Sequence, residues 1–224
     1  MRRFLRDHSL SLFFLALFLG ALVGQAISGH ILHNEDAQAH HGTTMTFWRY
    51  IVSSDFGNSV MENWQSEYLQ FMLFMLATIW FVERGSPESK KPGEQGTESD
   101  EEQKIGEHAD PDSPEWAKLG GFRTAVYSNS LFIVMSIIFF GSWFAQSVTG
   151  WTKYNANQVD HHEKVVSWIG YVGSADFWQA TLQNWQSEFL AVGSFVAITA
   201  FLRQRGSSQS KPVGAPHEAT GVEG

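Results

Sequence analysis

The sequence predicts an all-α integral membrane protein with four transmembrane helices, built as two tandem parallel two-helix repeats. Three observations support this prediction. Apolar residues gather in four blocks, the second half of the chain repeats the first, and basic residues are scarce in two of the loops between blocks. Short interfacial helices are expected in those two loops, which we call the outer loops.

The four apolar blocks predict spans at about 10–29, 64–82, 126–149 and 185–203. A helix needs about 20 mostly apolar residues to cross the hydrocarbon core of a bilayer. The first and third blocks reach this length directly, and the second and fourth reach it with part of the preceding NWQSE word. Core helices of soluble proteins keep a polar stripe, whereas these blocks are apolar on all sides over several turns.

An internal repeat organises the chain. Adding 121 to any residue number from 9 to 90 gives its counterpart, and 26 of these 82 pairs are identical. The words NWQSE (63–67 and 184–188) and RGS (84–86 and 205–207) recur intact. The predicted divisions are repeat 1 over 1–91, a linker over 92–121, repeat 2 over 122–212 and a tail over 213–224. Because the first block pairs with an internal block, we expect a retained helix and not a cleaved signal peptide.

The basic residues predict the orientation. Twelve of the fifteen Lys and Arg lie before the first predicted span, between the second and third spans, or from the last residue of the fourth span onward. The positive-inside rule therefore places both termini and the linker in the cytoplasm. The linker and tail are polar and rich in Gly, Ser and Pro, which predicts disorder. A net charge of −8 argues against a nucleic-acid partner.

The outer loops carry signals for short helices. Asp160 to Glu163 has capping-box spacing before the apolar positions up to Val172. The first loop has aromatic residues at the corresponding place, as suits a helix in the membrane interface. Asp55 and Asp176 are predicted N-caps of helices that continue into the second span of each repeat.

Polar side chains near the outer membrane boundary predict one cluster inside the spans. Asn63 and Glu67 share a helix face, as do Asn184 and Glu188, and glutamines of the first and third spans reach a similar depth. The candidate cluster is Gln25, Asn63, Glu67, Gln146, Asn184 and Glu188. An ionisable group at membrane depth is a functional hypothesis by default. The alternative is that the glutamates only bond headgroups or loop N–H groups and set the helix tilt.

Paired histidines in the outer loops suggest a metal site above this cluster. Imidazole and carboxylate ligands together suit zinc or another divalent ion, and the candidates are His40, His41, His161 and His162. A pH-sensing role or ordinary solvated loop histidines fit the same pattern. No other cofactor is predicted, and the absence of cysteine excludes disulfides and thiolate ligands.

Small residues four apart predict close helix packing in the first and third spans. They are Gly20, Gly24 and Ser28, with the counterparts Gly141, Ala145 and Thr149. Such spacing lets helix backbones approach each other in lipid.

The repeated words NWQSE[YF]L and RGS, placed around a span, a long outer loop and a second span, resemble an uncharacterised bacterial family of small multi-pass membrane proteins. The resemblance covers about 9–91 and 126–212. It implies the bacterial cytoplasmic membrane and supplies no activity. No P-loop, GxSxG or HExxH motif occurs, so no enzyme is predicted.

Three functional hypotheses are compatible with the sequence. The leading one is a non-enzymatic scaffold or accessory protein with a membrane-protein partner or a second copy of itself. The second is a small oligomeric transporter or proton- or ion-coupled protein using Glu67 and Glu188. The third is an outer-face metal-binding protein.

Overall fold

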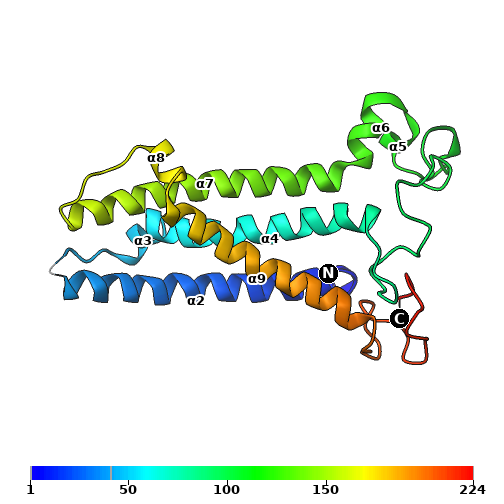
Figure 1. Ribbon diagram of the computed structural model, residues 1–224, viewed down its shortest axis with the longest axis horizontal. Helices are drawn as coiled ribbons and strands as arrows, with labels where there is room; N and C mark the ends of the chain where they lie inside the picture. Colours follow the sequence, from blue (N-terminus) through cyan, green and yellow to red (C-terminus); the bar gives the residue numbers. More distant parts are fainter. Residues whose placement is uncertain (1, 41, 224) are drawn as a thin grey trace. The chain divides into compact units, whose positions relative to one another are not determined.

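The protein is all-helical, as predicted. The computed structural model describes residues 2–40 and 42–223, and no strand occurs within them. The helices, shown in Figure 1, are α1 (Arg2–Asp7), α2 (Ser9–Ala39), α3 (Phe47–Tyr50), α4 (Ser54–Trp80), the 3₁₀ helix η1 (Gly106–His108), α5 (Glu115–Lys118), α6 (Gly121–Ser128), α7 (Ser130–Asp160), α8 (Trp168–Val172) and α9 (Ala175–Thr199).

The chain divides into two compact units, each described here by itself. Unit 1 comprises Met1–Met61 and Ala145–Val172. Unit 2 comprises Glu62–Phe144 and Gly173–Gly224.

Within the described residues, two helices are long and apolar enough to cross a membrane by length and composition: α2 and α7. They correspond to the first and third predicted spans. α4 and α9 contain the other two apolar blocks, but each also includes the polar word NWQSE. The findings thus support two of the four predicted spans.

The long helices extend beyond the apolar blocks. α2 and α7 continue to Ala39 and Asp160, about ten residues past the predicted ends of the spans. α4 and α9 begin near Asp55 and Asp176, as expected, but serine caps them. The Ser53 and Ser174 hydroxyls each accept a hydrogen bond from a backbone N–H three residues later. The prediction of aspartate caps was wrong, because each aspartate lies inside the first turn, where its charge still favours the helix N-terminus.

Unit 2 has an aromatic and apolar core. Leu69, Met72 and Phe139 are buried at its centre. The Trp143 ring lies nearly parallel to Phe139 and Phe177, with centroid separations of 5.7 and 6.2 Å. Offset aromatic packing of this kind adds stability beyond the area that it buries.

One hydrogen bond in unit 2 joins the two NWQSE words. The Trp185 indole N–H donates to the Gln65 side-chain oxygen at 2.7 Å, and Gln65 is fully buried. The Gln65 amide nitrogen donates to the backbone oxygen of Glu62 at 3.0 Å. Both ends of this buried amide are therefore satisfied, as burial requires.

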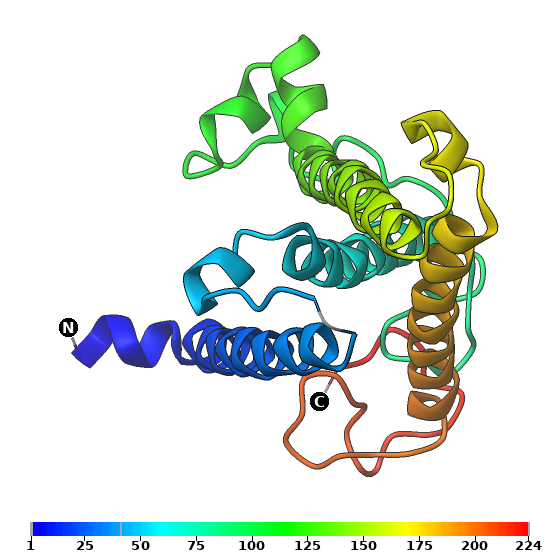
Figure 2. The same cartoon turned by 90° about the vertical axis from the view of Figure 1, so that its left-hand side faces the viewer.

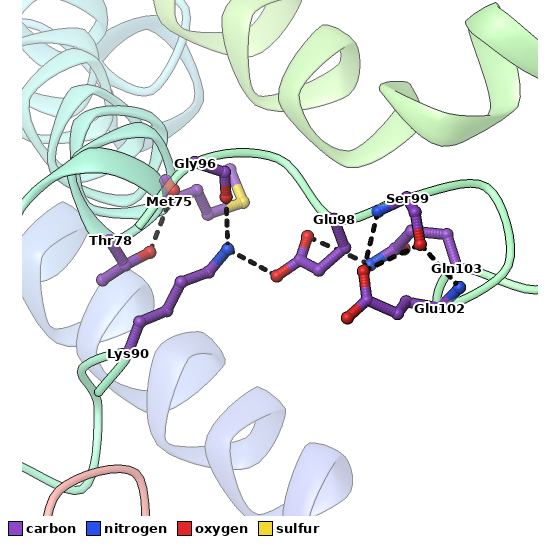
Figure 3. A network of polar contacts seen from close by, with 8 residues as sticks. All are labelled: Met75, Thr78, Lys90, Gly96, Glu98, Ser99, Glu102 and Gln103. Atoms are coloured by element: carbon purple, nitrogen blue, oxygen red, sulfur yellow. Dashed lines mark hydrogen bonds and ion pairs between the residues drawn. The ribbon is translucent and has the colours of Figure 1, made fainter. Parts of the chain in front are cut away.

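The linker over 92–121 has local structure. It contains η1 and α5, and α5 lies beside α6 ahead of α7, in green in Figure 2. Figure 3 shows a polar network in which Lys90 donates to the Gly96 carbonyl and pairs with Glu98. The pKa of Glu98 is lowered, first by its hydrogen bond from Lys90. The predicted disorder of the linker and tail stays a prediction.

We predict that Trp185→Phe destabilises the protein by about 1–3 kcal/mol. The change replaces the indole by a smaller aromatic ring and leaves the buried Gln65 oxygen without its donor. Thermal unfolding in mild detergent measures the effect. Trp48→Phe is the matched control because Trp48 is exposed, and equal losses in both variants would contradict the prediction.

Candidate functional site

In unit 1, the loops that follow α2 and α7 each fold back and form hydrogen bonds with the last turns of those helices. We call residues 29–56 the first cap and residues 150–172 the second cap. In the first cap, the Met45 N–H donates to the Asn34 side-chain oxygen at 2.8 Å, and the Asn34 amide nitrogen donates to the Met45 carbonyl at 3.0 Å. One side-chain amide thus replaces a backbone partner for both groups of Met45.

The second cap has the same contacts 121 residues later. The Val166 N–H donates to the Asn155 oxygen at 2.9 Å, and the Asn155 amide nitrogen donates to the Val166 carbonyl at 2.9 Å. The Trp151 indole N–H also donates to this carbonyl at 2.8 Å. His30, the counterpart of Trp151, has Nε2 2.8 Å from the Met45 carbonyl.

A tyrosine closes each cap against a glycine. The Tyr50 hydroxyl lies where a Cβ on Gly29 would be, and the Tyr171 hydroxyl lies where a Cβ on Gly150 would be. Both tyrosines are buried. Because any larger residue would overlap the hydroxyl, each glycine is required by the close approach of α3 or α8. α3 lies beside α2 in Figure 1.

The first cap contains a histidine–aspartate contact that the second cap cannot form. His33 Nδ1 lies 3.0 Å from the Asp55 carboxylate, and the His33 ring contacts the Tyr50 ring. Burial, and then the charge of Asp55, raises the pKa of Tyr50. The counterpart of His33 is Tyr154, which has no imidazole.

His40, His161 and His162 lie at helix C-termini. At the end of α7, His162 has a left-handed φ of 59°, its N–H donates to Val159, and the Glu163 N–H donates to Gln158. These are the two bonds of a Schellman motif. The predicted capping box at Asp160 was therefore wrong: the segment ends α7 and does not open α8.

The end of α2 repeats one of these bonds. The Gly42 N–H donates to the Ala37 carbonyl at 2.6 Å, the counterpart of the Glu163 bond. The His40 Nδ1 lies 3.3 Å from Asp36, and His41 lies outside the described residues. Among the residues that are described, no group of three His, Asp or Glu side chains is arranged to hold a metal ion. The metal site proposed at the paired histidines stays a prediction.

The predicted polar cluster divides between the units. In unit 1, the Gln25 amide donates to the Ser59 hydroxyl at 3.2 Å. Gln146 is fully buried, and neither atom of its amide is hydrogen bonded to the described chain. The counterpart of Ser59 is Ala180, so the second repeat lacks the hydroxyl that Gln25 uses.

The other four members belong to unit 2. Asn63 and Glu67 are exposed, whereas Asn184 and Glu188 are partly buried. Asn184 donates to the Ala180 carbonyl one turn earlier. The six-residue cluster stays a prediction.

The small residues have one close contact in unit 1. A Cβ built on Gly57 would lie 3.2 Å from the methyl group of Thr149. A Cβ on Gly20, Gly24 or Gly141 meets no described atom of its own unit within 4 Å. Close packing at these glycines, Ser28 and Ala145 stays a prediction.

Sequence reasoning did not single out the cap residues Asn34, Asn155 and His33. The signal for the two asparagines was present, since they are one of the identical pairs at the 121-residue offset. His33 carries no such signal, because its counterpart is a tyrosine.

A family model described as "Domain of unknown function (DUF6766)" matches residues 1–222. The chain belongs to this family. No curated protein and no solved structure matches it. The resemblance to an uncharacterised family is thereby confirmed, and the family assigns no activity.

We predict that Asn34→Ala and Asn155→Ala each destabilise the protein by about 1–3 kcal/mol. Each change removes one donor and one acceptor from a backbone N–H and C=O pair. Thermal unfolding in detergent measures both variants. Asn129→Ala removes only one exposed bond to its own helix and is the control. A loss in one cap without a loss in the other would contradict the shared architecture.

We predict that the protein loses stability as the pH rises past about 10, and that Tyr50→Phe reduces this loss. The folded pKa of Tyr50 is above its ordinary value of 10.0, so its stabilising effect is complete below that pH and disappears as the buried hydroxyl ionises. Unfolding midpoints across the alkaline range test this. Tyr127→Phe, at an exposed tyrosine, is expected to leave the alkaline loss unchanged.

Proposed function

We propose that this chain is a non-enzymatic scaffold of the bacterial cytoplasmic membrane, with four spans in two in–out–in repeats and both termini in the cytoplasm. The observation that carries the proposal is the pair of matching caps. Each is fixed by an asparagine amide and closed by a tyrosine, so that a rigid loop surface is held at the end of a long apolar helix.

The caps contact α2 and α7 at the positions where the apolar blocks of these helices end, which supports a membrane location. Tyr50 and Tyr171 contact Gly29 and Gly150, and these glycines lie where the first and third apolar blocks end. In the proposed topology, α3 and α8 lie at the level of the outer membrane boundary. Interfacial helices are amphipathic and place their apolar side chains into the headgroup region.

Exposed apolar side chains on both caps supply a binding surface. Trp48 is 74% exposed and Ile169, its counterpart, is 76% exposed. Each lies two residues before the buried tyrosine of its cap. Apolar groups held outward on rigid backbone suit a membrane-protein partner or the lipid interface.

The proposal counts α4 and α9 as the second and fourth spans. Both are continuous helices of 27 and 25 residues, long enough to cross a bilayer. Their polar NWQSE words are joined by the bond from Trp185 to Gln65, which removes part of the cost of burying them in lipid.

Cysteine labelling tests the four-span topology. Because the sequence contains no cysteine, the introduced residue is the one thiol that the reagent can label in each variant. With four spans, an impermeant maleimide labels Thr44→Cys and Lys164→Cys in intact cells. It labels Glu102→Cys and Ser208→Cys only after permeabilisation. With spans at α2 and α7 alone, the linker position would be labelled in intact cells and the second cap would be protected, which would overturn the proposal.

A second candidate function is proton or ion coupling through Glu67 and Glu188. It is favoured by the absence of any Lys, Arg or His from the helical segments 62–80, 130–144 and 175–199, so that no basic side chain shares a helix segment with either carboxylate. Ionisable groups at membrane depth are commonly part of an ion or proton pathway.

Proton flux into proteoliposomes separates the two functions. The scaffold proposal expects the wild-type protein and the Glu67→Gln, Glu188→Gln variant to match protein-free liposomes. Flux that is present in the wild type and lost in the variant would replace the scaffold with the coupled protein. Glu62→Gln, on the same helix, is the control.

A further inference from the structure

The RGS words open two turns with the same hydrogen bonds in unit 2. We call residues 83–90 the first RGS turn and residues 204–211 the second RGS turn. The Ser89 hydroxyl accepts from the Glu83 N–H, and the Ser210 hydroxyl accepts from the Gln204 N–H, both at 2.9 Å. Each hydroxyl also donates to the carbonyl of the following lysine.

The glycine and the serine of each RGS word also stabilise the turn itself. Gly85 and Gly206 have left-handed φ values of 93° and 81°, which glycine adopts without strain. Ser86 and Ser207 each accept a hydrogen bond from the backbone N–H two residues later, at 3.2 Å.

The closing lysines bind backbone carbonyls. Lys90 donates to Gly96 at 2.6 Å. Lys211 is buried and donates to Ala200, at the end of α9, and to Pro216 and His217. Burial, and then the charge of Arg203, lowers the pKa of Lys211. Arg203 itself donates to carbonyls of α9 and of the tail.

The arginine side chain is the one side chain of each RGS word that the turn does not use. Arg84 and Arg205 are exposed, and neither guanidinium has a hydrogen bond or ion pair with the described part of the chain. Exposed apolar side chains precede each of them at the helix end: Trp80, Phe81, Phe201 and Leu202. Aromatic and apolar residues followed by arginine are typical of a membrane–water boundary.

We propose that Arg84 and Arg205 bind the phosphate groups of anionic phospholipids in the cytoplasmic leaflet. The proposal rests on the membrane location proposed above and names the lipid class that the inner ends of α4 and α9 recognise. Guanidinium groups bind phosphate through paired N–H donors, and the apolar residues beside them are continuous with the acyl region.

The two turns differ in local charge, and this difference predicts which arginine contributes more to lipid binding. Glu83 and Glu88 accompany Arg84, whereas Gln204 and Gln209 occupy the corresponding positions beside Arg205. Carboxylates repel a lipid phosphate, so Arg205 is expected to contribute more to binding than Arg84.

Native mass spectrometry of the full chain in mild detergent, with added phosphatidylglycerol or phosphatidylcholine, tests this proposal. We expect the wild type to prefer phosphatidylglycerol, and Arg205→Gln to reduce that preference about five-fold. Arg84→Gln is expected to reduce it less, and the double variant more than either. Arg49→Gln, at an exposed arginine of the first cap, is the matched control.

Three results would overturn the proposal: an unchanged lipid preference in the double variant, an equal loss in Arg49→Gln, or full displacement of lipid by millimolar inorganic phosphate. The last would identify a soluble phosphate ligand. Unfolding midpoints near that of the wild type exclude misfolding as the cause of a loss. If cysteine labelling gives the four-span pattern while lipid preference is unaffected, this inference fails and the membrane proposal stands.

Discussion

In both caps, a single asparagine side chain binds the N–H and the C=O of one loop residue. Asn34 does this for Met45 and Asn155 does it for Val166. The loop that follows a long helix is thereby brought back to that helix with its backbone groups satisfied. Because the loop is fixed at this point, the short helix that comes next lies beside the long helix, and its buried tyrosine can pack against the helix glycine.

Backbone groups are also bound by side chains beyond the opposite ends of α4 and α9. Ser89 and Ser210 bind backbone groups of their RGS turns, and Lys211 binds the Ala200 carbonyl at the end of α9. In the second turn, Lys211 and Arg203 also hold tail residues 215–217 against the helix end. The repeated RGS word therefore begins a turn that follows a long helix, whereas the repeated NWQSE word lies inside the helices.

The two repeats keep these backbone contacts and differ in the side chains around them. His30 and His33 of the first cap correspond to Trp151 and Tyr154 of the second, so a histidine–aspartate contact occurs in the first cap and has no counterpart in the second. Gln25 bonds to Ser59, whereas neither amide atom of Gln146 has a hydrogen bond with the described chain. Repetition preserved the architecture, and the divergence gave each repeat its own chemistry.

The four long helices and their order could be predicted from the sequence, because apolar runs of helical length specify helices without reference to distant residues. The sequence alone also showed the 121-residue correspondence and the family resemblance. Only the tertiary structure showed that Ser53 and Ser174, and not the aspartates, cap their helices, and that His162 closes α7. It also paired Asn34 with Met45 and His33 with Asp55, because such contacts depend on how a loop returns through space, and no local pattern of residues specifies that path.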